Sequence, residues 1–207
     1  MVDQDYMTVE PATLADISDL ISLINEGLNP EGEENVYPHD VHGTKFATDV
    51  LNALVQADKK RVVVFVVRDP KGSVISTATV HKIDAGESFA SAWTGTDWGI
   101  PLQQGVQPET LDAVFGAWAR RHNKLMNPNP RVFLEALVTR KTWQKRGCAS
   151  AILEKAGETA DEYDYPLFLD AMIPEFYQKR GYIVLPDTSG TEAVGLPMVR
   201  KKKSERV

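Results

Sequence analysis

The sequence predicts an α/β fold with a mixed, partly parallel sheet. In the C-terminal half, strand-like and helix-like segments alternate, an order that brings parallel strands together beneath covering helices. Nearer the start, the run RVVVFVVR from Arg61 to Arg68 is apolar on both faces, as expected of a strand inside a sheet. The turn DPKG and the segment SVISTATVHKI then complete a hairpin.

Two helices are expected before this hairpin. Thr13 is placed to cap the first, with Asp16 three residues later, and Gly27 is expected to end it. The expected elements that follow are a carboxylate-rich loop, a second amphipathic helix, the hairpin, an irregular segment from Asp84 to Gln107 and a helix from Pro108 to Met126. The later half then adds the strand RVFLEALVT, a helix after Gly147, the strand LFLDA, a short helix ending at Gly181 and two more strands.

Composition narrows the function classes. The chain has 207 residues and no internal linker, so a single domain over residues 1–207 is expected. The 23 Lys and Arg residues are outnumbered by 29 Asp and Glu, which argues against nucleic acid as a partner. No apolar run approaches the roughly 20 residues of a membrane span, and the start does not resemble a signal peptide. With Cys148 its single cysteine, the protein is expected in the cytoplasm.

The most informative segment is LVTRKTWQKRGCASAIL. It leaves a strand, turns through Gly147 and enters a helix, whose first amide N–H groups lack intrahelical acceptors and form an anion site. A glycine at this turn lets a phosphate approach the backbone, and Lys141, Lys145 and Arg146 add positive charge. The alternative is an ordinary turn with solvated cations, because short glycine motifs are common.

A second motif makes the first more specific. The first motif, QKRGCA, fits the acyl-CoA signature Q/R-x-x-G-x-G/A, and a helix and a strand later the chain reads EFYQKRGY, which is similar to the segment FYxxxGF. With both motifs in this order, the sequence resembles the GNAT superfamily of N-acetyltransferases. Ala149 takes the place of the second glycine, which the family pattern allows, and Tyr182 takes the phenylalanine position, where we expect a core aromatic.

The resemblance implies a GNAT-like domain with a twisted sheet of about six to seven strands flanked by helices. Its acyl-CoA core would span about residues 131–185, and the basic tail 200–207 is expected to be frayed. The co-substrate implied is acetyl-CoA, and no metal is expected. The backbone that would hold its pantetheine arm belongs to Leu137, Val138 and Thr139. The amides that would bind its pyrophosphate belong to Gln144, Lys145, Arg146, Gly147, Cys148, Ala149 and Ser150.

The reaction implied is direct attack of a neutral amine on the thioester, in one ternary complex. Tyr177 matches the tyrosine that protonates or hydrogen-bonds the departing thiolate. Glu135 is the first candidate base; strand alternation places it on the face of Leu137 and Thr139, and a paired structural carboxylate is an equally weighted alternative. His81 is the second candidate, although a surface role is favoured for it. Cys148 is expected to be a core residue and not an acyl carrier.

The acceptor is expected to be a small-molecule or peptide amine. The loop between the first two helices carries His39 and His42, for which a solvated role is favoured, and four carboxylates, Glu31, Glu33, Glu34 and Asp40, which would either attract a cationic amine or form a solvated face. Trp93 and Trp98 are candidates for the wall of the acceptor pocket. The sequence leaves a monomer and a homodimer equally open. Two alternative functions remain: an acyl-CoA-binding sensor or scaffold without activity, and an unrelated nucleotide-phosphate binder.

Overall fold

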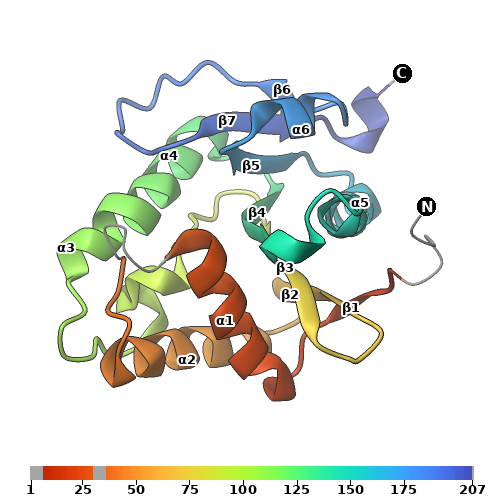
Figure 1. The fold of residues 1–207 in the computed structure, drawn as a ribbon. Coiled ribbons are helices and arrows are strands. Elements are labelled where there is room, and N and C mark those ends of the chain that lie inside the picture. Colours follow the sequence, from red (N-terminus) through yellow and green to blue (C-terminus); the bar gives the residue numbers. More distant parts are fainter. Residues whose placement is uncertain (1–6, 30–35, 207) are drawn as a thin grey trace.

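The computed structural model describes residues 7–29 and 36–206, and its elements follow the predicted order (Figure 1). The strands are β1 (Val9–Pro11), β2 (Val62–Arg68), β3 (Val74–Ile83), β4 (Arg131–Thr139), β5 (Leu167–Ala171), β6 (Ile183–Val184) and β7 (Leu196–Arg200). The α-helices are α1 (Ile17–Leu28), α2 (Val41–Gln56), α3 (Pro108–Leu111), α4 (Ala117–Met126), α5 (Cys148–Glu162) and α6 (Pro174–Gln178). Short 3-10 turns include η2 (Leu14–Asp16), η3 (Ala92–Thr94), η4 (Thr96–Trp98), η6 (Lys141–Trp143) and η7 (Lys203–Glu205).

All seven strands form one sheet in the order β1-β2-β3-β4-β5-β7-β6. Strands β4 and β5 pair in parallel, whereas the other neighbours pair antiparallel. The predicted mixed, partly parallel sheet is therefore confirmed, as is the predicted hairpin of β2 and β3. In Figure 1, β1 and β2 lie at one end of the sheet, and β5, β7 and β6 lie at the other.

Helices cover both faces of the sheet. On one face, α5 packs its apolar stripe, which includes Ile152, Leu153 and Ala156, against β2 to β5. On the other face, α1, α2 and the chain between β3 and β4 bury a second cluster around Phe46 and Trp93. We name these the α5 face and the α1 face. Tyr182 is 3% exposed on the α5 face, so its expected core role is confirmed.

The sheet opens between β4 and β5. These strands pair only from Val132 and Leu167 to Leu134 and Leu169. Beyond Leu134, β4 runs on for five more residues to Thr139, and among the described residues it pairs there with β3 alone. Beyond Leu169, β5 pairs with β7 and with no other described strand. Two facing strand edges with unpaired backbone groups therefore border an opening at the carboxyl ends of both strands.

A β-bulge at the mouth of this opening corrects the prediction for Glu135. Thr79 pairs with Ala136 and Val80 with Leu134, so Glu135 has no partner residue on β3. Such an extra residue shifts the alternation of side chains along its strand. The side chain of Leu137 therefore packs on the α5 face, whereas Glu135 points to the α1 face. The prediction that Glu135 shares a face with Leu137 and Thr139 is wrong.

The start of α1 forms as predicted, but its end does not. The backbone N–H and hydroxyl of Thr13 donate to Asp16 Oδ2 at 2.8 and 3.0 Å, which is the expected capping box. Gly27 lies inside the helix, which runs to Leu28. A Cβ on Gly27 would lie 2.3 Å from Val138 Cγ1, so this glycine allows α1 to approach β4 closely.

The chain between β3 and β4 forms a long insertion on the α1 face. Its predicted irregular part contains the turns η3 and η4, and its predicted helix is continuous from α3 through a π-helical segment, η5 (Asp112–Gly116), into α4. Arg121 of α4 donates to three carbonyl oxygens, those of Ala193, Val194 and Gly195. The insertion therefore positions the β6–β7 connection beside the end of β5.

The basic tail is packed rather than frayed, which corrects the prediction for residues 200–206. The guanidinium of Arg200 donates to both carboxylate oxygens of Asp161 on α5. Ser204 donates from its N–H and its hydroxyl to Asp164 at 2.8 and 2.7 Å. In the part of the chain that the structure describes, no helix has the length and apolar character needed to cross a membrane.

Candidate functional site

The turn between β4 and α5 presents free backbone donors beside the opening. Among residues 7–29 and 36–206, none accepts a hydrogen bond from the N–H groups of residues 145–150. Lys145 has φ of +61° and Gly147 has φ of +97°, the left-handed region that favours glycine. A side chain at Gly147 would meet only the end of the Met7 side chain, 3.5 Å away. The turn can therefore receive an anion at the N-terminus of α5.

Positive side chains surround this turn. Arg146 lies with its guanidinium 4.8 Å from the centre of the Trp143 ring, and Lys145 is exposed. Arg180, which the sequence analysis did not select, donates to Ser150 Oγ at 2.6 Å and stacks 3.9 Å above the Phe176 ring. The signal for Arg180 was present in the second motif, since it directly precedes Gly181. A ligand with two phosphates would find both amides and guanidinium groups here.

The turn is anchored to the sheet and to α1. Glu26 of α1 accepts from the N–H of Lys141 at 2.6 Å, and Gln144 Nε2 donates to the carbonyl of Thr139 at 3.3 Å. The side chain of Cys148 is 1% exposed, and burial raises the pKa of its thiol. A buried thiol with a raised pKa is a poor nucleophile. The expected core role of Cys148 is therefore confirmed.

Tyr177 lies in α6, directly after β5, on the α5 face. Its ring packs edge-on against Tyr182, with 5.7 Å between the ring centres, in the same apolar cluster as Leu137. Burial raises the pKa of Tyr177 to about 12, although the nearby Arg180 acts in the opposite direction. The hydroxyl is therefore protonated at neutral pH and is available as a hydrogen-bond donor.

The two predicted base candidates form one buried pair. Glu135 Oε2 lies 2.8 Å from His81 Nε2, and Glu135 Oε1 accepts from the hydroxyl of Ser91. The side chains of Glu135 and His81 are 2% and 4% exposed, so the favoured surface role for His81 is wrong. Sequence analysis missed Ser91, because it lies in the irregular segment, where no periodicity marks a position.

The bulge places Glu135 and Tyr177 on opposite faces of the opening. Glu135 is on the α1 face, near the insertion, whereas Tyr177 is on the α5 face, beside the turn before α5. The carboxylate of Glu135 and the phenol of Tyr177 are therefore separated by the sheet.

A second buried carboxylate, Asp170, lies on β5 at the opening. It follows Leu169, the last residue paired with β4, and its Oδ1 lies 2.6 Å from Nη2 of Arg121. Burial raises the pKa of Asp170 to about 6, against the opposing effect of Arg121. Because Arg121 also binds residues 193–195, this ion pair connects β5, α4 and the β6–β7 connection at one side of the opening.

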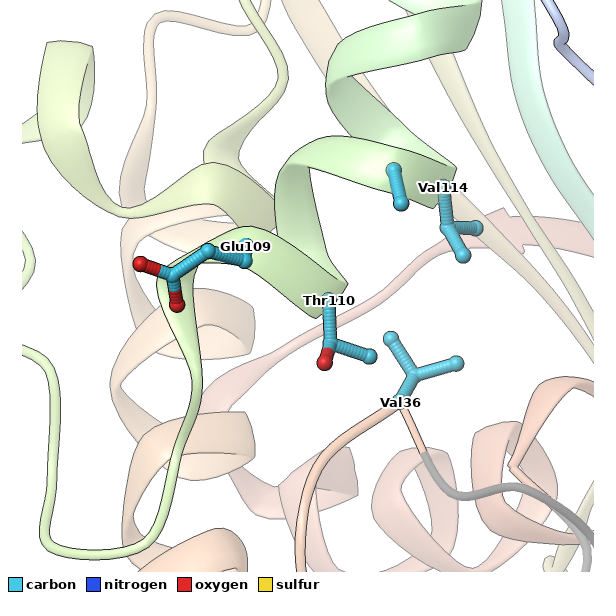
Figure 2. A pocket seen from close by; sticks show the side chains of 5 residues that line it. Val36, Glu109, Thr110 and Val114 are labelled. Carbon is cyan, nitrogen blue, oxygen red and sulfur yellow. The ribbon is translucent and has the colours of Figure 1, made fainter.

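Two cavities flank the π-helical segment. One, of about 350 Å³, is lined by Val36, Glu109, Thr110, Ala113 and Val114. Figure 2 shows Thr110 beside Val36, with the carboxylate of Glu109 turned away from them. The other, of about 310 Å³, is lined by different residues of the helix, and Ser91 is among its lining residues.

No family model and no curated protein matches the sequence. A crystal structure from Corynebacterium glutamicum, described as histone acetyltransferase HPA2 and related acetyltransferase, superposes with a TM-score of 0.61. The two chains are 18% identical, and the match covers 98% of this chain and 99% of that one. The chain has the GNAT fold.

Two further acetyltransferase structures match this chain over most of its length. Arylalkylamine N-acetyltransferase 2 from Aedes aegypti matches with a TM-score of 0.59 at 12% identity, over 94% of this chain and 98% of that one. PaiA N-acetyltransferase from Thermoplasma acidophilum, in complex with coenzyme A, matches with a TM-score of 0.55 at 12% identity and the same coverage. The seven-stranded sheet with one parallel pair is thus the arrangement of this fold.

The structure also places the residues that the sequence analysis considered for the acceptor side of the site. Trp93 is 1% exposed and belongs to the core, whereas Trp98 is half-buried and donates to the carbonyl of Ala90. His39 is exposed, as favoured. Asp40 caps α2 by accepting from the N–H groups of residues 42 and 43, and Glu31, Glu33 and Glu34 lie outside the described residues. Within residues 7–29 and 36–206, no cluster of three or more His, Cys, Asp or Glu is placed to hold a metal.

Proposed function

We propose that the protein is an N-acetyltransferase that moves an acetyl group from acetyl-CoA to the primary amine of a small molecule or peptide. The observation that carries this proposal is the opening between β4 and β5 beside the free amides of the turn before α5. The amides can bind a diphosphate, and the unpaired edge of β4 can bind an extended amide-containing arm. Coenzyme A contains both groups in one molecule.

In this proposal, the amides of residues 144–150 and the guanidinium of Arg180 bind the pyrophosphate of acetyl-CoA. The pantetheine arm lies along the backbone of residues 137–139, where β4 has no partner on the β5 side. Two structures of the same fold, PaiA N-acetyltransferase and YhbS from Escherichia coli, are described in complex with coenzyme A, which supports coenzyme A as the ligand. The thioester then lies in the opening between the two faces.

The acceptor amine attacks from the α1 face. An amine is mostly protonated at neutral pH, so it must lose a proton before it attacks. Glu135 is the base in this proposal, because its carboxylate lies at the bulge on that face. His81 and Ser91 hold both carboxylate oxygens, which fixes the orientation of the base. Backbone N–H groups of β4 stabilise the oxyanion of the tetrahedral intermediate.

The thiolate of coenzyme A leaves toward the α5 face, where Tyr177 donates a hydrogen bond to it. The products are the N-acetylated acceptor and free coenzyme A. This reaction needs one amine acceptor and no metal. In this proposal the protein acts in the cytoplasm, as a monomer or as a homodimer.

A direct test is to incubate the purified chain with acetyl-CoA and a panel of amines and to measure free thiol. We expect thiol release that depends on the acceptor. We also expect Glu135→Gln, a nearly isosteric change, to lower kcat by roughly 10²-fold, which is typical for loss of a general base. Thermal stabilisation by acetyl-CoA should be kept in this variant, because the carboxylate does not bind the cofactor.

Other outcomes would support the alternative functions. Stabilisation by acetyl-CoA without any acceptor-dependent thiol would indicate an acyl-CoA sensor or scaffold. Stabilisation by ATP or NAD, with none by coenzyme A, would indicate an unrelated nucleotide-phosphate binder. A liganded structure with coenzyme A outside the opening would contradict the proposed function directly.

A further inference from the structure

The hydrogen-bond partners of Glu135 differ in their surroundings. His81 packs against two aromatic rings, with its ring centre 4.9 Å from that of Phe89 and 6.2 Å from that of Phe133. Ser91 lies on the other carboxylate oxygen and lines the cavity of about 310 Å³. Of the two partners, only Ser91 connects Glu135 to this cavity within the described residues.

The cavity opens to solvent at its rim. Its floor consists of buried residues, which include Phe89, Ser91 and Ala119. Its rim carries the exposed side chains of Thr96, Asp97, Asp112 and Arg120. A cavity of this volume with several polar groups can hold ordered water molecules. It shares no lining residue with the cavity of Figure 2.

A base at this position needs a separate route for its proton. Glu135 is 2% exposed, and a bound acceptor amine and acyl-CoA arm would fill the opening in front of it. The proton that Glu135 takes from the amine must still reach solvent before the next turnover. Hydroxyl groups transfer protons by accepting one on a lone pair while releasing their own.

We propose that Ser91 relays the proton from Glu135 to water in this cavity. In this step, the protonated Glu135 gives its proton to Ser91 Oγ, and the hydroxyl proton of Ser91 passes to a cavity water, which restores the Glu135 carboxylate and the neutral serine. The proposal rests on the proposed acyltransferase function. It assigns the insertion between β3 and β4 a role in turnover, because Ser91 and the cavity walls both belong to it.

The test compares Ser91→Ala, Ser91→Thr and Thr110→Ala with the wild type at saturating acetyl-CoA and acceptor, in weak buffer. Ser91→Ala should lower kcat by roughly 10²-fold, which is the lower end of the range for proton-transfer groups. Ser91→Thr keeps the hydroxyl and should stay close to the wild type. Thr110→Ala removes a hydroxyl from the other cavity, the one shown in Figure 2, and should leave kcat unchanged.

Imidazole separates a relay from a purely structural role. It is small enough for the cavity and exchanges protons readily near neutral pH. Added imidazole should restore most of the kcat lost in Ser91→Ala and should leave the wild type unchanged. A wild-type kcat in Ser91→Ala would overturn the relay. A low kcat that imidazole does not restore would show that Ser91 only positions Glu135, and would overturn it as well.

A measurement on the wild type covers the case in which Ser91→Ala does not fold, since Ser91 Oγ also accepts from the N–H of Trp93. The relay moves two protons. A plot of the wild-type kcat against the deuterium fraction of the solvent should therefore be curved. A linear dependence would contradict it. Absence of acceptor-dependent thiol release by the wild type would reject the proposed function itself, and the relay with it.

Discussion

At the scale of single residues, the environment of Tyr177 decides how it can assist the leaving thiolate. Burial raises the pKa of its hydroxyl to about 12, whereas an ordinary thiol has a pKa of about 8.5. Complete proton transfer from the phenol to the thiolate would be uphill by about 5 kcal/mol, at 1.36 kcal/mol for each pKa unit. A hydrogen bond carries no such cost. The structure therefore favours hydrogen bonding over proton donation.

Tyr177→Phe should slow turnover and keep cofactor binding. A hydrogen bond to a charged group contributes about 1.5–3 kcal/mol, so kcat should fall by roughly 10- to 100-fold. The KM for acetyl-CoA should change little, because the bond forms as charge develops on sulfur. Steady-state kinetics with the amine at saturation would measure both constants. An unchanged kcat would remove Tyr177 from the mechanism.

Tyr182→Phe provides the matched control for this prediction. The Tyr182 ring lies against Tyr177, and its hydroxyl is buried without a hydrogen-bond partner in the described part of the chain. Removing an unpaired buried hydroxyl should leave kcat unchanged and should not lower the melting temperature. A similar loss of kcat in both variants would indicate a general disturbance of the α5 face.

At the scale of elements, the sequence predicted what depends on local pattern. The order of the elements along the chain, the hairpin, the capping box at Thr13 and the glycine turn before α5 all follow from periodicity or from residue types at fixed spacing. Glu135 and His81 were selected from the sequence as alternative base candidates on separate strands. Their contact was not predictable, because it depends on how β3 and β4 pair.

The bulge at Glu135 shows why the remaining features escaped prediction. Alternation along β4 assumes regular pairing, and one extra residue reverses the face of every position that follows. Ser91 is positioned only by the packing of the insertion, and Gly27 only by the distance between α1 and β4. Each of these features belongs to a contact between elements, and single-sequence periodicity does not report such contacts.

Gly27→Ala tests the close approach of α1 to β4. Alanine in an exposed helix would add up to about 1 kcal/mol of stability. Here its Cβ would lie 2.3 Å from Val138 Cγ1, a stiff and buried side chain. Overpacking of this kind typically costs about 1–3 kcal/mol, so we expect a net loss of about 1 kcal/mol in the free energy of unfolding. Urea denaturation would measure it.

A double-mutant cycle with Val138→Ala identifies the cause. Truncating Val138 removes the methyl group that a new Cβ would meet, so the cost of Gly27→Ala should disappear in that background. The coupling energy should then be favourable by about 1 kcal/mol or more. Additive effects of the two substitutions would show that the contact between Gly27 and Val138 does not limit the packing of α1.

At the scale of the whole molecule, the opening separates two functions of the sheet. Helices α1 and α2 and the insertion cover the α1 face, which carries Glu135. The turn before α5, α5 itself and α6 cover the α5 face, which carries Tyr177. The parallel pair of β4 and β5 joins them, because it brings both strand ends to one edge of the sheet. In the proposed reaction, the donor and the acceptor therefore approach from opposite faces of the sheet.

Acid stability is a property of the whole fold, and one partly buried ion pair should contribute to it below pH 4. Asp16 of η2 lies 2.6 Å from Arg68 of β2, its side chain is 6% exposed, and the hydrogen bond from Arg68 lowers its pKa from 3.8 to about 2. A carboxyl with a depressed folded pKa stabilises the protein above its unfolded pKa. That stability, about 2 kcal/mol, is lost as the pH falls from 4 through 2.

The free energy of unfolding should therefore fall between pH 4 and pH 2 in the wild type by about 2 kcal/mol more than in Asp16→Asn, as measured by denaturant unfolding at each pH. Asp170 does not obscure this window, because its raised pKa of about 6 means that it is already protonated when Asp16 begins to titrate. The sign for Asp170 is opposite, since a raised folded pKa adds stability as the pH falls from 6 to 4. Parallel curves for the wild type and Asp16→Asn below pH 4 would show that Arg68 does not hold Asp16 ionised in the folded protein.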